Sequence, residues 1–319
     1  MTDVGDISIS VVIPAHNRAD VVARAVRSAL GQTRAPSEVI VVDDASEDDT
    51  GAVARAAGAS VLRRPEAQGS GFARNAGIRA ATSEWIAFLD SDDLWLPDHL
   101  ARAADHLGSG VLVAAPAVDT EGRGRGLPGI GLVELSSAAC FIPESPIVTS
   151  GVVARRDALM AAGLFRAFER AQDGDMWARL LEHGRGVALP EPTVVYSARP
   201  RGQASVALDR AWLDAVMASL STRPWMSRRV RTGVRARYHW DDLTSSVARR
   251  DPAALARSAA WLGVHPATWS MLSGLLAARR RNRDPRWAAL LDAVPDDRTH
   301  ATRDTGPTST RDSRGVTEG

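Results

Sequence analysis

The sequence predicts an α/β fold, with a doubly wound, mostly parallel sheet and a C-terminal helical appendage. Three observations support this prediction. Short apolar runs alternate with helix-like stretches over about the first 115 residues, polar residues directly follow several of these runs, and from about residue 206 only helical patterns remain. Strands that alternate with helices are typical of βαβ units, which build mostly parallel sheets.

Four strands and three helices are predicted in the N-terminal part of the chain. The strands are short runs rich in Val and Ile, whereas apolar residues in the helices recur every three or four positions. In chain order the elements are strand 8–13, helix 19–30, strand 38–42, helix 48–57, strand 60–62, helix 71–80 and strand 84–89. Pro14 should end the first strand, and Gly58 should end the second helix.

Two further strands and four helices are predicted downstream. Their ranges are strands 147–153 and 193–196, and helices 211–220, 228–248, 253–262 and 267–281, which prolines separate. Residues 296–319 have almost no apolar side chains, so the tail should be disordered. The expected division is an α/β domain over 1–205 with halves of about 8–115 and 116–205, a helical appendage over 206–294 and a tail over 295–319.

The composition excludes several classes of function. The chain has 319 residues and a formal net charge of +1, so no overall field gathers nucleic acid. Lys is absent, which excludes a Schiff base and a Walker A phosphate loop. Cys140 is the single cysteine, so there is no intramolecular disulfide. Without a signal peptide or a run of about 18 apolar residues, a cytoplasmic protein is expected.

The residues that directly follow the strands are unusually polar. They are Pro14–Arg18 after the first strand, Asp43–Ser46 after the second and Asp90–Asp93 after the fourth. Ligands bind at the carboxyl ends of strands in such sheets. Acidic residues there can bind ribose, a base or a divalent cation, although Ser46 and Asp48 can equally cap a helix. Three carboxylates within four residues repel one another, which favours a bound cation at Asp90–Asp93.

Six segments together resemble the family 2 glycosyltransferases. They read VVIPAHNR, VIVVDDAS, GSGFARNAGI, WIAFLDSDDLWLPDHL, TSGVVARRDALMAAGLF and QDGDMWARLLEHG, and the resemblance covers about residues 8–205. It implies the GT-A fold, a Rossmann-like arrangement, and transfer of a sugar from a nucleoside diphosphate donor with inversion at the anomeric carbon. It also implies Mg²⁺ or Mn²⁺, because a divalent cation stabilises the charge that develops on the leaving diphosphate.

The resemblance assigns a role to each residue of the donor site. The expected donor-binding residues are Pro14, Ala15, His16 and Asn17 after the first strand, Asp43 and Asp44 after the second, Arg74 in the third helix, and Asp90 and Asp92 after the fourth strand. Asp44 matches the carboxylate that binds the base. Arg74 matches a basic residue near the phosphates, with a helix-surface arginine as the alternative. Asp92 and Asp93 are the expected metal ligands of the family's acidic DXD element.

On the acceptor side, the resemblance makes Asp173 the general base that takes the proton of the acceptor hydroxyl. Helix capping is the alternative for Asp173 and for Asp175. Gln172 departs from the family pattern, which has an acidic residue there. Residues 149–151 are small enough for an acceptor to approach, or belong to an ordinary packed strand. Arg199 and Arg201 lie in a segment that resembles a loop closing over the diphosphate, and a solvated loop is equally compatible.

The expected function is inverting sugar transfer from a nucleoside diphosphate donor, with a UDP- or dTDP-sugar preferred, in cell-surface polysaccharide or glycoconjugate synthesis. The acceptor stays open among saccharides, lipid-linked molecules and small molecules. The alternative is a non-catalytic sugar-nucleotide-binding scaffold. A dinucleotide oxidoreductase is disfavoured, because no GxGxxG follows the first strand. Two Arg clusters, 228–237 and 279–283, could also hold the chain at an anionic membrane surface on the inner face of the cell membrane.

Overall fold

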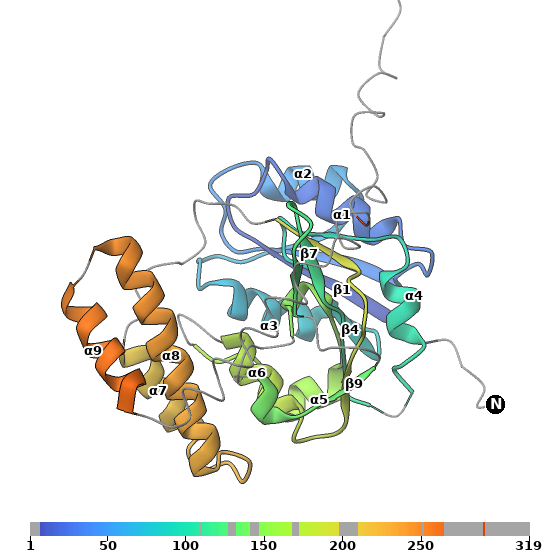
Figure 1. Cartoon of the computed structure of the whole chain (residues 1–319). Coiled ribbons are helices and arrows are strands. Elements are labelled where there is room, and N and C mark those ends of the chain that lie inside the picture. Colours follow the sequence, from blue (N-terminus) through green and yellow to red (C-terminus); the bar gives the residue numbers. More distant parts are fainter. Residues whose placement is uncertain are drawn as a thin grey trace, which may run out of the picture.

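The computed structural model describes residues 7–108, 110–126, 132–140, 147–167, 172–197, 210–250, 252–264 and 290. Its centre is an eight-stranded sheet (Figure 1). In sheet order the strands are β3 (Ser60–Arg63), β2 (Glu38–Asp43), β1 (Ile9–Ala15), β4 (Trp85–Phe88), β10 (Val152–Arg155), β6 (Leu112–Ala114), β11 (Gly186–Ala188) and β9 (Val133–Leu135). Only β10 and β9 run against the other six, so the predicted mostly parallel sheet is confirmed.

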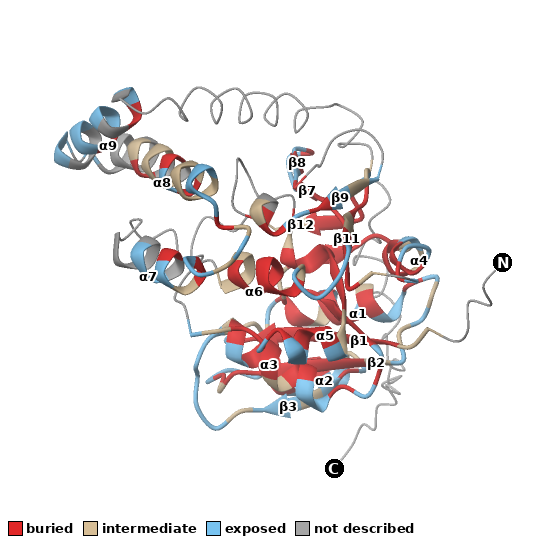
Figure 2. Cartoon of the chain, turned by 90° about the horizontal axis from the view of Figure 1, so that it is seen from below, coloured by how far each residue is buried: buried red, intermediate tan, exposed pale blue. Residues whose placement is uncertain are grey.

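Helices cover both faces of this sheet. The first face packs against α1 (Val22–Leu30), α2 (Thr50–Ala56) and α4 (His99–Ala104). The second packs against α3 (Ser70–Ala80), α5 (Arg156–Ala161) and α6 (Gln172–Leu180). Ile9, Val11 and Ile13 of β1 point to the first face and Val12 to the second, so β1 is buried throughout (Figure 2). Each such side chain contributes about 1.5 to 3 kcal/mol when it is fully buried.

β1 continues two residues beyond its predicted end and includes Pro14. The Val12 carbonyl accepts a hydrogen bond from the Leu89 amide, so even-numbered residues of β1 direct their backbone groups toward β4. Because β4 ends at Phe88, the position of Pro14 requires no backbone donor on that side. A proline is therefore tolerated here, and β1 carries the chain to the rim of the sheet.

The predicted strand over 147–153 is wrong in its first part. Residues Thr149–Gly151 form a 3-10 turn, η2, and the strand β10 starts only at Val152. The reason is tertiary: the Ser150 side chain bonds to groups of the loop after β4, and a Cβ on Gly151 would lie 2.0 Å from the carbonyl oxygen of Ala115. Gly is therefore required at this close approach of two backbones.

A second, smaller sheet completes the α/β part. Its order is β5 (Leu94–Trp95), β12 (Val194–Tyr196), β7 (Ala117–Asp119) and β8 (Gly124–Arg125). Of these strands only β12 was predicted, over 193–196. β12 pairs with residues nearly 80 to 100 positions earlier in the chain, and it brings Ser197 beside the loop that follows β4.

Of the C-terminal helices, α7 (Arg210–Leu220) and α8 (Arg228–Arg249) lie beside α6, and α9 (Pro252–Val264) packs against α8 on the side away from α6 (Figure 1). Glu182, just after α6, accepts hydrogen bonds from Arg223 at 2.6 Å and from the Trp225 indole at 2.7 Å. The predicted helix 267–281 and the whole of the predicted tail lie outside the described residues. The predicted domain boundaries stay predictions.

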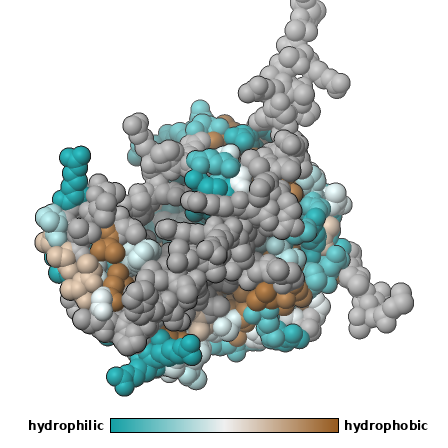
Figure 3. Space-filling model, viewed as in Figure 1, coloured by the Kyte–Doolittle hydropathy of each residue, from teal (hydrophilic) through white to brown (hydrophobic). Residues whose placement is uncertain are grey.

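Among the described residues, none of the helices is both long enough and apolar enough to cross a membrane. On the face shown in Figure 3, the described surface is largely hydrophilic and its hydrophobic residues form small groups. The exposed large hydrophobic side chains of the described part are scattered over several elements and are Leu30, Leu62, Phe72, Leu132 and Met160.

His99 is fully buried at the start of α4. Its ring stacks on Trp95 with a centroid distance of 4.3 Å, and its Nδ1 lies 2.7 Å from Thr193 Oγ1. Burial lowers the pKa of His99 to about 3. In the unfolded chain this imidazole takes up a proton below about pH 6.5, whereas the folded chain keeps it neutral down to about pH 3. Its contribution to stability is therefore present above pH 6.5 and is lost as the pH falls toward 3.

His99→Phe is expected to weaken this pH dependence. Phe keeps an aromatic ring against Trp95 but cannot bind a proton, so the variant should be less stable at pH 7.5 and yet lose less stability on acidification. The parent should lose more than about 1 kcal/mol of unfolding free energy per pH unit below pH 6 from this group. Urea unfolding at pH 7.5, 6.0 and 4.5 measures how steeply the free energy of unfolding changes with pH in the parent and in the variant. Equal slopes would show that His99 is protonated in the folded state.

Candidate functional site

A cavity of about 680 Å³ opens at the carboxyl ends of β1, β2 and β4. The loops that follow these three strands form one side of it, and the first turns of α3 form the other. Its lining residues are Pro14, Ala15, His16, Asn17, Arg18, Asp44, Ala67, Gly69, Ser70, Ala73, Arg74, Asp90, Ser91 and Asp92. Eight of the residues predicted to bind a donor are in this lining, namely Pro14, Ala15, His16, Asn17, Asp44, Arg74, Asp90 and Asp92.

The loops after β1 and β2 are bonded to each other. His16 Nδ1 lies 2.8 Å from the carbonyl oxygen of Asp44. A carbonyl can only accept, so Nδ1 carries the hydrogen and Nε2 is the acceptor in the neutral ring. The Asn17 amide donates to Ser46 Oγ at 3.0 Å. Asn17 (φ 52°) and Ala45 (φ 58°) both adopt the left-handed conformation, which is costly for Ala and is common at functional sites.

Asp44 lines the cavity with its carboxylate held from one side. Asp44 Oδ1 accepts from Arg64 Nη1 at 2.5 Å, and Oδ2 accepts from the amides of Gly69 at 2.7 Å and Gln68 at 3.1 Å. These charge-assisted bonds fix the carboxylate in the wall of the cavity. Arg64 carries no local signal in the sequence, because its partner lies 20 residues away.

Asp43 lies outside the cavity lining. Its carboxylate is buried and accepts from the Ser46 amide at 2.9 Å and from Arg63 Nη1 at 2.6 Å. In this position Asp43 shapes the turn after β2 and ties it to the end of β3. The structure therefore gives Asp43 a supporting position behind Asp44.

Arg74 and Asp90 form an ion pair in the wall of the cavity. Arg74 Nη2 donates to Asp90 Oδ1 at 2.5 Å, and Arg74 Nη1 lies 3.4 Å from Ser70 Oγ. Arg74 is buried, with a side-chain exposure of 6% against 34% for Asp90. Arg74 is thus an inward-facing cavity residue, and the alternative of a helix-surface arginine does not hold.

Asp93 points away from the cavity lined by Asp92. It is buried, and its two oxygens accept from Ser150 Oγ at 2.5 Å and from the Ser197 amide at 2.9 Å. Burial, together with the negative charges of Asp90 and Asp92, raises the pKa of Asp93 to about 8. A direct metal contact by Asp93 would require its carboxylate to leave both partners.

Asp173 lies in the first turn of α6 and contacts η2. Thr149 Oγ1 donates to Asp173 Oδ2 at 3.1 Å. The preceding residue, Gln172, donates through Nε2 to Ser70 Oγ at 3.2 Å, and Ser70 lines the cavity. The N-terminus of α6 is therefore held between η2 and the wall of the cavity.

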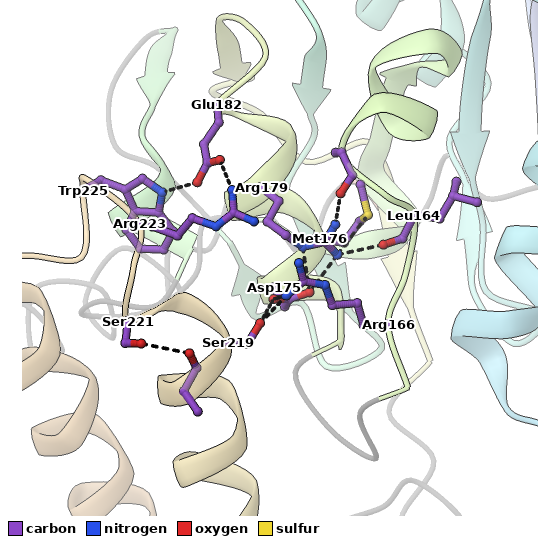
Figure 4. Close-up of polar contacts among 12 residues, drawn as sticks. Leu164, Arg166, Asp175, Met176, Arg179, Glu182, Ser219, Ser221, Arg223 and Trp225 are labelled. Atoms are coloured by element: carbon purple, nitrogen blue, oxygen red, sulfur yellow. Dashed lines mark hydrogen bonds and ion pairs between the residues drawn. The ribbon is translucent and has the colours of Figure 1, made fainter.

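Asp175 has a different environment, although it follows Asp173 by two residues. Its side chain is fully buried, and Oδ2 accepts from Arg179 Nε at 2.9 Å and Nη2 at 2.7 Å (Figure 4). Arg179 also donates to the carbonyls of Ala162 and Leu164. Arg166 lies 3.6 Å from the other Asp175 oxygen. This network joins α6 to the loop after α5, so Asp175 is structural.

The comparisons with known proteins agree with this geometry. Residues 10–168 match the family model described as Glycosyl transferase family 2, a range that includes β1 from its second residue, β2 to β4 and every residue of the cavity lining. The chain belongs to glycosyl transferase family 2.

Proteins similar to this family 2 chain include the succinoglycan biosynthesis protein ExoU of Rhizobium meliloti (strain 1021), which is 32% identical over 205 residues, or 58% of this chain and 60% of ExoU. The chain covers less than two thirds of the length of the curated relatives it matches first. Among solved structures, S. aureus TarS 1-349 in complex with UDP-GlcNAc has a TM-score of 0.64 at 18% identity, covering 80% of this chain and 79% of TarS.

A second solved structure supports the same fold. The mannosyltransferase PcManGT from Pyrobaculum calidifontis, in complex with GDP-Man and Mn²⁺, has a TM-score of 0.58 at 21% identity and covers 92% of this chain and 86% of its own. The GT-A fold expected from the resemblance is confirmed. At these identities the likeness concerns the fold alone.

The described residues of this family 2 chain do not complete a cation site by themselves. Within the described part of the chain, no three His, Cys, Asp or Glu side chains converge on one point. Asp90 and Asp92 do line the same cavity. Mg²⁺ is commonly held by one or two carboxylates together with substrate phosphates. The residues fit a cation that binds together with a diphosphate.

Two predicted site residues of the family 2 chain, Arg199 and Arg201, lie outside the described residues. The structure in turn adds cavity residues that the sequence analysis did not assign, namely Arg18, Ala67, Gly69, Ser70, Ala73 and Ser91. The sequence does contain a signal for Gly69 and Ser70. Small residues directly before a predicted helix leave its first backbone amides open to an anion.

Proposed function

We propose that this family 2 chain transfers a sugar from a nucleoside diphosphate donor to an acceptor hydroxyl, with inversion at the anomeric carbon. A UDP- or dTDP-sugar is the proposed donor. We place the reaction in the synthesis of cell-surface polysaccharide or glycoconjugate, on the cytoplasmic side of the membrane. The name of the similar protein ExoU, which refers to succinoglycan biosynthesis, supports the polysaccharide context.

One observation above all supports this proposal. Asp44, Arg74, Asp90 and Asp92 line one cavity at the carboxyl ends of parallel strands. A fourth carboxylate, on Asp173, is tied to that cavity through its neighbour Gln172 and Ser70. The Asp44 carboxylate suits hydrogen bonding to a nucleobase. Arg74, with the carboxylates of Asp90 and Asp92, suits a diphosphate and its cation, and the separate Asp173 carboxylate suits removal of a proton from the acceptor.

Each residue then has a proposed role. Asp44 accepts a hydrogen bond from the base, Arg74 binds a phosphate oxygen, and Asp92 with Asp90 holds Mg²⁺ or Mn²⁺. The cation supplies Lewis-acid stabilisation of the charge on the departing diphosphate. Asp173 takes the proton of the acceptor oxygen as this oxygen bonds to the anomeric carbon and the bond from that carbon to the diphosphate breaks. The UDP-GlcNAc complex of TarS and the GDP-Man and Mn²⁺ complex of PcManGT support a donor and cation of this kind.

The acceptor side of the proposal includes contact with an anionic membrane surface. Arg228, Arg229 and Arg235 of α8 are exposed. Clustered arginines each add roughly 1 kcal/mol of attraction to anionic lipid. A lipid-linked acceptor would then be presented close to the protein.

The experiment that tests this function measures donor consumption. UDP-, dTDP- and GDP-sugars are incubated with the full chain and Mn²⁺, and release of the nucleoside diphosphate is followed before and after chelation. Release from one donor class that stops on chelation supports an enzyme. Binding of a donor, seen as a thermal shift, without release under any condition would favour the scaffold. Co-sedimentation with anionic and with neutral vesicles tests the membrane contact, which fails if both bind equally.

A further inference from the structure

The turn η2 connects the proposed base with the acidic loop after β4. Thr149, its first residue, is buried and donates from Oγ1 to Asp173 Oδ2 at 3.1 Å. Ser150, its second residue, donates to Asp93 at 2.5 Å. One three-residue turn thus touches both a carboxylate of the acidic loop and the carboxylate of α6.

The backbone of η2 is held in place from several sides. Ser150 Oγ accepts from the Asp90 amide at 3.1 Å, and the Ser150 carbonyl accepts from the Trp95 indole at 2.6 Å. The Gly151 carbonyl accepts from the Ala115 amide at 2.8 Å. These partners belong to the sheets and their loops and Thr149 itself is buried, so the fold fixes the backbone that carries the Thr149 hydroxyl.

The base itself has rotational freedom that this hydroxyl can remove. An Asp side chain turns about two bonds, and Asp173 is only partly buried. At the N-terminus of α6, Asp173 accepts a side-chain hydrogen bond from Thr149, and Gln172 donates one to Ser70. A catalytic carboxylate that is held before the acceptor arrives avoids an orientation cost during the reaction.

We propose that Thr149 is a positioning residue for the reaction. Its hydroxyl holds Asp173 Oδ2, which leaves Oδ1 to take the proton of the acceptor. This inference rests on the proposed function, because it needs Asp173 to act as the base. The inference also gives Asp93 and Ser150 a role, because they fix η2, the turn that carries Thr149. In this way they set the distance between the donor cavity and the Asp173 carboxylate.

The test compares two substitutions of Thr149. Thr149→Val removes the hydroxyl at constant size and should lower kcat about tenfold, the usual effect of losing one hydrogen bond to a charged group. The KM for the donor and the Kd for UDP should stay at the parent values. Thr149→Ser keeps the hydroxyl and should restore most of kcat. Thr82→Val is the matched control, because the Thr82 hydroxyl bonds Glu38 at the opposite end of the sheet.

The outcomes separate this inference from the proposed function when Asp173→Asn is assayed in parallel. If Asp173→Asn is inactive but Thr149→Val turns over like the parent, the positioning role is wrong and the function stands. If Asp173→Asn is as active as the parent, the base assignment fails and the positioning role fails with it. If Thr149→Ser is as slow as Thr149→Val, packing and not the hydroxyl is responsible. Should Thr149→Val fold poorly, Thr149→Ala removes the hydroxyl without placing a second methyl group in its position.

Discussion

Asp173→Asn is expected to lower turnover by about a hundredfold to ten thousandfold, the usual contribution of a general base. An amide cannot take the proton of an acceptor hydroxyl. Asn has the size of Asp, and its oxygen can still accept the hydrogen bond from Thr149. The donor cavity is lined by other residues, so the Kd for the nucleoside diphosphate should barely change. Initial-rate kinetics and calorimetry with UDP measure the two quantities separately.

Asp175→Asn is the control for this prediction, and its effect should be on stability. Asp175 is fully buried against Arg179, and the substitution leaves the buried guanidinium without its charged partner. Breaking such a pair costs about 3 to 5 kcal/mol, so the melting temperature should drop by many degrees. If Asp173→Asn retains normal turnover while a folded Asp175→Asn does not, the base is Asp175.

The first half of the fold was predictable because its signals are local. The four strands β1 to β4 and the helices α1 to α3 were each predicted within three residues at either end. In a parallel sheet covered on both faces, strands are continuous apolar runs, and the helices between them show their own period. Among these strands the largest error is at the end of β1, which was predicted to stop before Pro14. A proline is tolerated in β1 because of where β4 ends, and the residues next to Pro14 in the sequence do not show this.

The short strands of the second half were not predictable in the same way. β5, β7 and β8 have two or three residues each, and they form through pairing with distant strands: β5 and β7 pair with β12, and β8 pairs with β7. The turn η2 replaces the first part of a predicted strand because Ser150 and Gly151 meet groups that are distant in sequence. Such elements depend on tertiary contacts, which local propensity does not contain.

In the candidate site, too, local sequence predicted some residues, and others are known only from tertiary contacts. Asp44, Asp90 and Asp92 were found because they directly follow strands, and the structure places them in one cavity. The partner of Asp44, Arg64, and the partners of Asp93, Ser150 and Ser197, come from other segments of the chain. The sequence therefore predicted which residues carry charge at the site, whereas the structure shows which of them face the cavity.

Asp92→Asn is expected to abolish the response of UDP affinity to Mn²⁺. In the parent, Mn²⁺ should raise the affinity for UDP at least about tenfold, since a cation shared by carboxylate and phosphate oxygens adds several kcal/mol. Asp92 lines the cavity beside Asp90, so its loss removes a ligand where the diphosphate is proposed to lie. The ratio of the Kd values without and with Mn²⁺ should fall to about one. Calorimetry with UDP, in Mn²⁺ and after chelation, measures this ratio.

Asp93→Asn is the matched variant, because Asp93 is the neighbouring carboxylate and points away from the cavity. Its oxygens are engaged by Ser150 and Ser197 and not by the cavity, so the variant should keep the Mn²⁺ response. The opposite pattern, a response lost in Asp93→Asn and kept in Asp92→Asn, would assign the cation to Asp93. The Asp93 carboxylate would then have to leave Ser150 when donor and cation bind, and η2, which carries Thr149, would lose one of its anchors at the same moment.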